Sequence, residues 1–403
     1  MRPAFLLALL LSACAPRVEA PTELCCTATI IAVVPEGAPT VYLTGDLQEL
    51  GPWDADALPM TGAGRERYAR VTVPEGAVFQ YKFTLGDWRR EALGPSGMVM
   101  ANFRLEMNKN TEVRHEVTDF RKDTIEYVRD WRGSGVQGQL IYWTDFQSAI
   151  LGPKRHVSIW LPPGYEQDAE RRYKTLYMSD GQNLFDPRIA NTGVDWGVDE
   201  AVTALVEEGA IEPVIVIGVW SSDKRGPEYS PWHGAGAYAR FLIEELMPRV
   251  NAKFRTLTGP ENTAHMGSSM GGLLSFHLVR THPEVFGACG CVSTHFPLSE
   301  AMAAQYFPLG DRPVDPDATP YILKDIAAGL SVPAGVRLWF DYGTEGLDAD
   351  YAPTHAAVRE ALLADGLIEG EDFEMRAYDG ADHNETSWRA RLKDPLRFLY
   401  GKS

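Results

Sequence analysis

The stretch Gly267-Ser268-Ser269-Met270-Gly271 decides the fold of this chain. The pattern G-x-S-x-G is typical of the sharp turn between a strand and a helix that lifts a serine hydroxyl out of an α/β sheet. Residues 261–266 have an apolar end that can form a short strand, and residues 272–279 follow the pattern of a packed helix. Glycines flank the serine because such a turn leaves no room for β-carbons. We therefore predict that Ser269 is a nucleophile.

From residue 138 onward, strand patterns alternate with helical patterns, which is typical of a mostly parallel sheet with helices on both faces. Residues 214–219 form a continuous apolar run, as expected for a central strand that is covered on both sides. Residues 138–403 are therefore predicted to form one α/β domain. Further predicted strands cover 156–161, 173–178, 337–342 and 373–378, and predicted helices cover 199–208, 237–247 and 354–364.

A serine hydroxyl needs a base within hydrogen-bond reach, and the base needs an orienting acid. In this fold class the order along the chain is serine, acid, histidine. His383 lies in a loop after the predicted strand 373–378, so we expect it to be the base. His355 is the other late histidine, and because it falls in a helical stretch we interpret it as structural.

The acid is expected just after the predicted strand 337–342. Asp341 still belongs to that strand, and the other candidates are Glu345, Asp348 and Asp350. We favour Asp348, with Glu345 as the alternative.

The negative oxygen that develops on an attacked carbonyl group needs backbone N–H donors. One predicted donor is Met270, the residue after the nucleophile. The other is Gln182, in the loop 179–185, where Gly181 lets the backbone approach a substrate. Met270 and Gln182 are therefore the predicted oxyanion hole.

These pieces together resemble the putative-esterase family of α/β-hydrolases, which includes esterase D, feruloyl and acetyl xylan esterases, enterochelin esterases and mycolyltransferases. The resemblance implies a serine enzyme that forms an acyl-enzyme, with Ser269 and His383 in the roles given above. In the family the acid usually follows a Gly-Thr pair by one or two residues, whereas Gly343-Thr344 is followed at once by Glu345 and only later by Asp348. The matching segments are 160–165, 176–185, 267–272 and His383-Asn384-Glu385 with Trp388. Arg225 and Glu228 also match a long loop of the family, where they either brace the loop or face the substrate, and we favour bracing.

Short alternating runs separated by turns predict a small all-β sandwich over residues 27–118, followed by a linker over 119–137. The segments 41–53, 79–83 and 102–104, together with Trp88, resemble a starch-binding domain, a carbohydrate-binding module. The resemblance implies a sugar platform of Trp53, Lys82 and Trp88, in which aromatic rings pack on the C–H face of a sugar while the lysine bonds its hydroxyl groups. The alternative is a spacer module with Trp53 in its core.

The N-terminal residues have the pattern of an export signal. Arg2 precedes the apolar run 4–11, which is too short to span a bilayer, and Leu11-Ser12-Ala13-Cys14 resembles the lipobox of bacterial lipoproteins. We expect residues 1–14 to be the leader with a lipidated Cys14, residues 15–26 to be a tether, and the protein to be exported and anchored by lipid to the bacterial cell envelope, at the outer membrane or in the periplasm. The alternative is an ordinary signal peptide.

Composition excludes several classes of protein. The chain has 403 residues, of which 45% are hydrophobic, enough for two folded domains. Its net charge of −17 argues against a nucleic-acid partner. Neither a nucleotide-binding loop nor a cysteine or histidine pattern for a metal occurs, so we expect no cofactor and no metal. Cys289 and Cys291 lie in an apolar run and are interpreted as buried residues.

The sequence therefore predicts a serine carboxylic-ester hydrolase that acts on an acylated carbohydrate or a related ester, with possible polysaccharide binding by the sandwich. Two other readings stay open. One is acyl transfer or the hydrolysis of a siderophore ester. The other is a surface glycan-binding lipoprotein with an inactive hydrolase domain. Residues 297–329 are expected to shape the substrate pocket.

Overall fold

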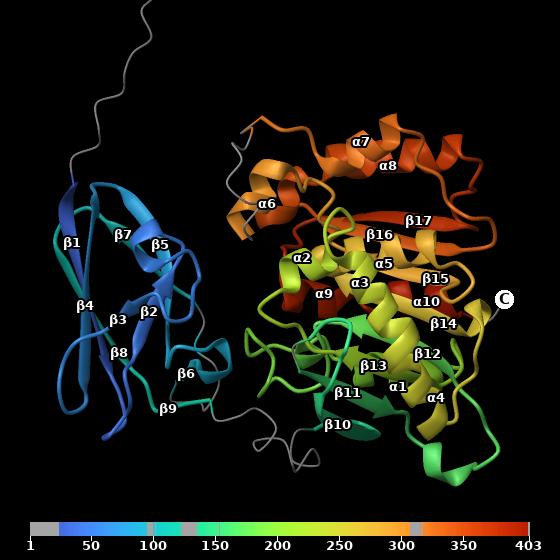
Figure 1. Cartoon of the computed structure of the whole chain (residues 1–403), viewed down its shortest axis with the longest axis horizontal. Coiled ribbons are helices and arrows are strands. Elements are labelled where there is room, and N and C mark those ends of the chain that lie inside the picture. Colours follow the sequence, from blue (N-terminus) through green and yellow to red (C-terminus); the bar gives the residue numbers. More distant parts are fainter. Residues whose placement is uncertain are drawn as a thin grey trace, which may run out of the picture. The chain divides into compact units, whose positions relative to one another are not determined.

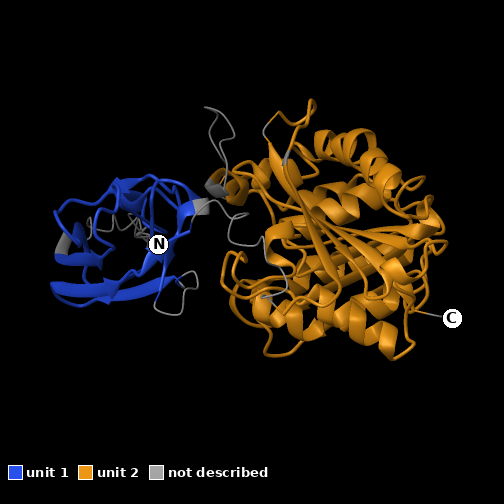
Figure 2. Ribbon diagram, turned by 90° about the horizontal axis from the view of Figure 1, so that it is seen from below, with its two compact units in different colours: residues 1–96, 100–121 blue, residues 97–99, 122–403 orange. Residues whose placement is uncertain are grey.

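The computed structural model describes residues 24–94, 100, 102–121, 135–152, 154–306, 315 and 317–401. The predicted leader with Cys14, and the predicted tether up to residue 23, lie outside the described residues. The chain divides into two compact units, one of residues 1–96 and 100–121 and the other of residues 97–99 and 122–403 (Figure 2).

The N-terminal unit is built from two main sheets, of order β4-β1-β8 and β3-β2-β5-β7, and a two-stranded sheet, β6-β9. The strands β1 and β8 pair in parallel, and all the other pairs are antiparallel. Phe79, Tyr81 and Phe83 alternate along β5 and all lie in the core, because every second side chain of a strand points to the same face. The strands are β1 (Leu24–Val33), β2 (Tyr42–Gly45), β3 (Leu58–Pro59), β4 (Glu66–Pro74), β5 (Ala77–Thr84), β6 (Ala92–Leu93), β7 (Phe103–Met107), β8 (Thr111–Glu116) and β9 (Asp119–Phe120).

The end of this unit differs from the predicted boundary at residue 118. β9 pairs with β6, and Arg121 is buried with a guanidinium nitrogen 3.5 Å from the carboxylate of Glu91. The first residues of the predicted linker 119–137 therefore belong to the sandwich, because they complete a strand pair and an ion pair. Residues 122–134 of that linker lie outside the described residues.

The C-terminal unit contains an eight-stranded sheet of order β10-β11-β13-β12-β14-β15-β16-β17 (Figure 1). The first two neighbour pairs are antiparallel and all the others are parallel. The predicted α/β-hydrolase fold is confirmed. The strands are β10 (Gln139–Phe146), β11 (Arg155–Leu161), β12 (Lys174–Ser179), β13 (Val214–Val219), β14 (Thr263–Ser268), β15 (Ala288–Val292), β16 (Arg337–Gly343) and β17 (Phe373–Tyr378).

Helices cover both faces of this sheet and form two cores. On β13, Ile215 and Ile217 belong to one core, and Val214 and Val216 belong to the other. Both sets are fully buried, which explains the continuous apolar run of this strand. The main helices are α1 (Val198–Glu207), α2 (Arg225–Tyr229), α3 (Ala235–Arg240), the π-helix η6 (Phe241–Leu246), α4 (Met247–Lys253), α5 (Met270–Thr281), α6 (Glu300–Tyr306), α7 (Tyr321–Ala327), α8 (Ala352–Ala364), α9 (Glu385–Arg391) and α10 (Lys393–Tyr400).

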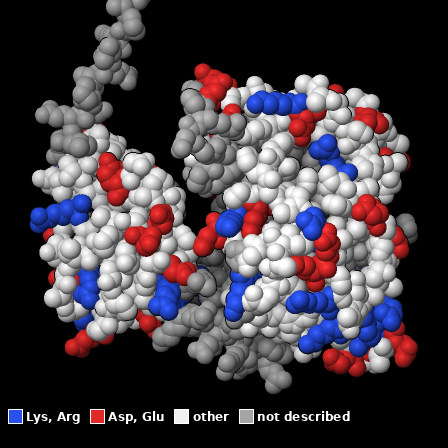
Figure 3. Space-filling view, viewed as in Figure 1, with Lys and Arg blue, Asp and Glu red and all other residues white. Residues whose placement is uncertain are grey.

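Charged side chains of both signs are mixed over the surface. Figure 3 shows acidic and basic side chains beside one another on the face in view. Arg359 and Glu369 form one ion pair of partly exposed side chains. Across the part of the chain that the structure describes, no helix combines the length and the apolar composition that a membrane span requires.

The central strand gives a direct test of the fold. Ile217→Ala removes a fully buried side chain, so we expect the free energy of unfolding of the C-terminal unit to fall by about 2–5 kcal/mol. Ile368→Ala, at a side chain that is 53% exposed, is the control and should change it by less than about 0.5 kcal/mol. Urea unfolding followed by circular dichroism measures both. Equal losses would contradict the central, doubly covered position of β13.

Candidate active site

Ser269 lies at a strained turn between β14 and α5. Its φ is 56° and its ψ is −119°, a left-handed region that a residue with a side chain seldom adopts. A β-carbon on Gly267 would lie 2.9 Å from the backbone of Gly271, and one on Gly271 would lie 3.0 Å from the Ser179 side chain. Only glycines fit this turn, which leaves the Ser269 side chain partly exposed at the carboxyl end of the sheet.

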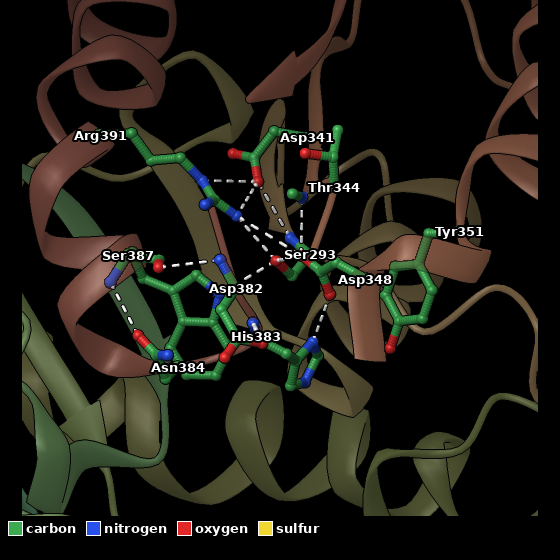
Figure 4. Close-up of polar contacts among 12 residues, drawn as sticks. Ser293, Asp341, Thr344, Asp348, Tyr351, Asp382, His383, Asn384, Ser387 and Arg391 are labelled. Atoms are coloured by element: carbon green, nitrogen blue, oxygen red, sulfur yellow. Dashed lines mark hydrogen bonds and ion pairs between the residues drawn. The ribbon is translucent and has the colours of Figure 1, made fainter. Parts of the chain in front are cut away.

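His383 and Asp348 are brought together across 35 residues of sequence. His383 Nδ1 lies 2.5 Å from Asp348 Oδ1, as Figure 4 shows. Asp348 is fully buried, while the His383 side chain is 14% exposed. The imidazole ring also meets the edges of Tyr351 and Trp388, with centroids 5.7 Å and 5.1 Å away. These contacts fix the plane of the ring, and the bond at Nδ1 leaves Nε2 as the nitrogen available to a nucleophile.

The surroundings of Asp348 favour its ionised form. Burial alone would raise the pKa of this carboxyl group, but hydrogen bonds from His383, Ser293 and the Gly343 amide, together with the charge of His383, hold its pKa below the ordinary value of 3.8. The folded state therefore gains stability from this group at neutral pH, and that gain is lost as the pH falls through the lowered pKa.

Asp348 is the candidate acid that bonds His383, and the other candidates have different surroundings. Glu345 is exposed at the start of the 3-10 turn η8 (Gly346–Asp350), and Asp350 is exposed at its end. Asp341 is buried in β16, where it accepts hydrogen bonds from the Trp339 indole and the Ser293 amide.

Two glycines join the loop of the acid to the loop of the histidine. The amides of Thr344 and Glu345 both donate to the carbonyl of Ala381, at 3.0 Å each. A β-carbon on Gly343 would collide with this carbonyl, and one on Gly346 would collide with the side chain of Asp382. The relative position of acid and base is therefore set by backbone contact.

The predicted oxyanion loop lies against the turn. Met270 is the first residue of α5, so its N–H has no carbonyl one turn earlier to bond. The loop of Gln182 reaches the same place, because the Ser179 side chain packs on Gly271. The side chain of Gln182 is held by Ser221, with Nε2 donating to Oγ at 2.7 Å and Oε1 accepting from the Ser221 amide at 3.1 Å.

Arg225 and Glu228 brace this region. Arg225 bonds both carboxylate oxygens of Asp180, at 2.7 Å each, and Asp180 has a left-handed φ of 55° at the start of the loop. Glu228 makes a second bidentate pair with the buried Arg155, at 3.0 and 3.1 Å. Neither side chain is left without an internal partner, which fits a bracing role for both.

Glu385 joins the oxyanion loop to the helix that follows His383. Its carboxylate accepts from Asn183 Nδ2 at 3.3 Å and from the Thr192 hydroxyl at 3.1 Å. Burial raises the pKa of Glu385 above its ordinary value.

Sequence reasoning missed His295. Its amide donates to the carbonyl of Ser269 at 3.3 Å, and its Nδ1 lies 2.5 Å from the hydroxyl of the buried Tyr351. Burial, and then the neighbouring charges of His383 and Arg225, lower the pKa of His295 to about 4. The only available signal was position, because His295 follows the end of β15, next to the strand of the nucleophile.

One group of acids among the described residues could hold an ion. The carboxylates of Asp195, Asp199 and Glu200 lie within 4.8 Å of one another. Arg389 already bonds Asp195 at 2.8 Å and Glu200 at 2.9 Å. Burial and the adjacent Glu200 raise the pKa of Asp199 to about 8, so this pair can share a proton. A guanidinium and a shared proton thus offset two of the three negative charges of this cluster.

In the N-terminal unit, Trp53 and Trp88 come together but Lys82 does not join them at the surface. The two partly exposed rings have centroids 6.4 Å apart and an angle of 43° between their planes. Lys82 is buried, and its Nζ lies 2.7 Å from the carboxylate of Glu91. The prediction of Lys82 as a sugar ligand needs correction, because Glu91 bridges to Thr84 beside β5 and takes up the ammonium group.

Comparison with known proteins identifies relatives. Residues 148–399 match the sequence model of the family described as Putative esterase. A protein of Bacillus subtilis (strain 168), "Uncharacterized protein YbbA", is 24% identical over 268 residues, which are 62% of this chain and 94% of that protein. An "Endo-1,4-beta-xylanase/feruloyl esterase" of Xylanibacter ruminicola is 26% identical over 296 residues, which are 69% of this chain and 33% of that protein. The chain thus spans about a third of the Xylanibacter relative.

A solved structure resembles both units. The enterobactin esterase of Shigella flexneri is 16% identical, with a TM-score of 0.51 over 92% of this chain and 92% of that chain. At this identity the likeness concerns the fold.

The assignment of the acid can be tested without a substrate. A fluorophosphonate labels a serine that a neighbouring base activates, so Asp348→Asn should slow labelling of Ser269 by about a thousandfold to ten-thousandfold, because His383 loses its orienting carboxylate. Glu345→Gln is the matched control, and its labelling rate should stay at that of the unmodified protein. Mass spectrometry of the labelled peptide measures both rates. Slow labelling in the Glu345 variant alone would assign the acid to Glu345.

Proposed function

The chain belongs to the Putative esterase family, since the matched residues make up more than half of its length, and we propose that it cleaves its ester through an acyl-enzyme on Ser269. As a member of this family it is a carboxylic ester hydrolase. The proposal of a serine mechanism rests above all on one observation, the buried Asp348 carboxylate 2.5 Å from His383 Nδ1. The strained backbone of Ser269, at the end of β14, adds to it.

The proposed reaction has two halves. His383 Nε2 takes the proton of the Ser269 hydroxyl while its oxygen attacks the carbonyl carbon of the ester. The amides of Met270 and Gln182 stabilise the oxyanion that forms. Collapse of this intermediate breaks the bond to the alcohol, which leaves with the proton from His383. Water then attacks the acyl-serine in the same way and releases the acid, while Asp348 stabilises the imidazolium in both halves.

We propose an acylated carbohydrate or a phenolic-acid ester of one as the substrate class. Two observations support this class. One relative is a xylanase joined to a feruloyl esterase. The other is the pair of partly exposed tryptophans in the N-terminal unit. A pyranose ring offers C–H groups that pack on such rings.

The serine mechanism predicts a burst. With p-nitrophenyl acetate the protein should release one equivalent of p-nitrophenol quickly and then turn over steadily, because an acyl-enzyme accumulates. Ser269→Ala should lose the burst and about 10⁴-fold or more of kcat, since the nucleophile is absent. Stopped-flow absorbance measures both. Undiminished turnover in this variant would contradict the mechanism.

A panel of esters then separates the substrate classes. Methyl ferulate, acetylated xylo-oligosaccharides and a catecholate–serine ester cover the alternatives, and an added glycan acceptor would reveal acyl transfer by its product. Higher kcat/KM for the sugar esters supports the proposed class, and preference for the catecholate ester would replace it.

Glycan binding by the N-terminal unit is a separate proposal. Trp53→Ala and Trp88→Ala should each weaken binding of maltoheptaose by about tenfold, because each ring contributes one stacking face. Tyr68→Ala is the control, since Tyr68 is an aromatic side chain of the same unit that is 44% exposed and lies on β4, a strand to which neither tryptophan belongs. Isothermal titration of the full chain measures the three affinities. Equal affinity in all variants would assign the tryptophan pair to packing.

A further inference from the structure

Ser293 connects the candidate acid to a second, deeper layer of polar side chains. It follows β15 directly, with a left-handed φ of 40°. Its hydroxyl lies 2.5 Å from Asp348 Oδ2, 3.0 Å from the indole nitrogen of Trp388 and 2.7 Å from Nη2 of Arg391 (Figure 4). Ser293 is fully buried, so no solvent competes for these bonds.

The chemistry of the partners fixes the direction of each bond. The indole of Trp388 and the guanidinium of Arg391 can only donate, and so they occupy both lone pairs of the Ser293 oxygen. The one proton of this hydroxyl is then left for Asp348 Oδ2. The Gly343 amide donates to the same oxygen at 2.7 Å. With Oδ2 supplied by two donors, Oδ1 is the oxygen that faces His383.

Arg391 is itself held by a second buried acid. Its Nε and Nη2 lie 3.1 and 2.9 Å from Asp341 Oδ1, and its guanidinium is also 3.9 Å from Asp348 Oδ2. Asp341 further accepts from the Ser293 amide at 3.0 Å and from the Trp339 indole at 2.7 Å.

The charges of this cluster suit a neighbouring imidazolium. Asp348 and Asp341 are the acids and Arg391 is the base, all of them nearly or fully buried. One positive and two negative charges leave a net charge of about −1, which a protonated His383 cancels. Buried charges that are left unpaired are costly, so this negative charge suits a positive charge that develops on the imidazole during the reaction.

We propose that Ser293 and Arg391 are positioning residues for the reaction, which orient Asp348 toward His383 and set its charge. This inference rests on the proposed serine mechanism. Neither residue touches the substrate. Both act through Asp348, with Asp341 as the anchor of Arg391. The competing possibility is that the cluster only stabilises the fold.

The pH profile distinguishes these two roles. The Ser293 hydroxyl and the Arg391 guanidinium each withdraw negative charge from Asp348. When one of them is removed, Asp348 becomes more negative, and the Asp348–His383 pair holds its proton more tightly. Ser293→Ala should therefore move the acid limb of kcat/KM to higher pH by about half a unit to one unit. It should also lower kcat about 10- to 100-fold, the equivalent of one hydrogen bond to a charged group, with KM unchanged. A purely structural role would leave the acid limb in place.

Variants of Arg391 supply a second measurement. Arg391→Met should move the acid limb in the same direction, whereas Arg391→Lys, which keeps the positive charge, should leave it closer to that of the unmodified enzyme. If Arg391→Met does not fold, the pH profiles of Ser293→Ala and Arg391→Lys still distinguish a positioning role from a purely structural one. Ser158→Ala is the matched control, because Ser158 is a buried serine that accepts a tryptophan indole N–H at 2.6 Å on a different strand. Its acid limb should not move.

The outcomes of these assays are separable. If the Ser269→Ala variant keeps the activity of the unmodified enzyme, the proposed serine mechanism is wrong, whatever the role of the cluster. Activity that depends on Ser269, together with an unmoved acid limb and an unchanged kcat in Ser293→Ala and Arg391→Met, would overturn the positioning role. Reduced thermal stability alone in these variants would count for the structural role.

Discussion

The close approach of β14 and α5 at Ser269 is the constraint on which the rest of the site depends. The Gly267 and Gly271 backbones come so close that neither position can carry a β-carbon. The serine between them must then take a left-handed conformation, which costs about 1–3 kcal/mol. The loop of Gln182 can pack against the same turn because Gly271 presents no side chain to Ser179. Nucleophile and predicted oxyanion donors are thus placed by one steric condition.

Polar order extends from this turn into the protein interior. Behind His383 lie two buried carboxylates and one guanidinium. The Ser293 hydroxyl bonds Asp348 and Arg391, and Arg391 in turn bonds Asp341. Around the predicted oxyanion loop, Arg225 and Arg155 each hold an acid by two bonds. Removal of one partner of such a pair leaves an unpaired buried charge, so these groups are coupled in stability as well as in position.

The fold could be predicted from sequence because each piece of it is local. The spacing of Gly267 and Gly271 predicted the turn at Ser269, and the continuous apolar run of residues 214–219 predicted the central strand. The choice of the acid stayed open in the sequence because spacing does not tell which residue of a short 3-10 turn points inward. In the structure Asp348 is buried and Glu345 is exposed. Lys82 was misjudged because its partner Glu91 is brought near only by strand pairing. Arg391 gave no signal, because an arginine in a helix is ordinary unless its buried partner is known.

The contacts of α9 have a consequence for biosynthesis. Glu385 and Arg389 bond Asn183 and Asp195, partners 202 and 194 residues earlier in the chain. His383, from the same C-terminal segment, meets Asp348 only after both have been synthesised. A growing chain that has already formed the turn at Ser269 therefore lacks the proposed base His383 and the contact of Glu385 with the loop of Asn183. The contact between His383 and Asp348 is therefore a late event in the assembly of this unit during synthesis.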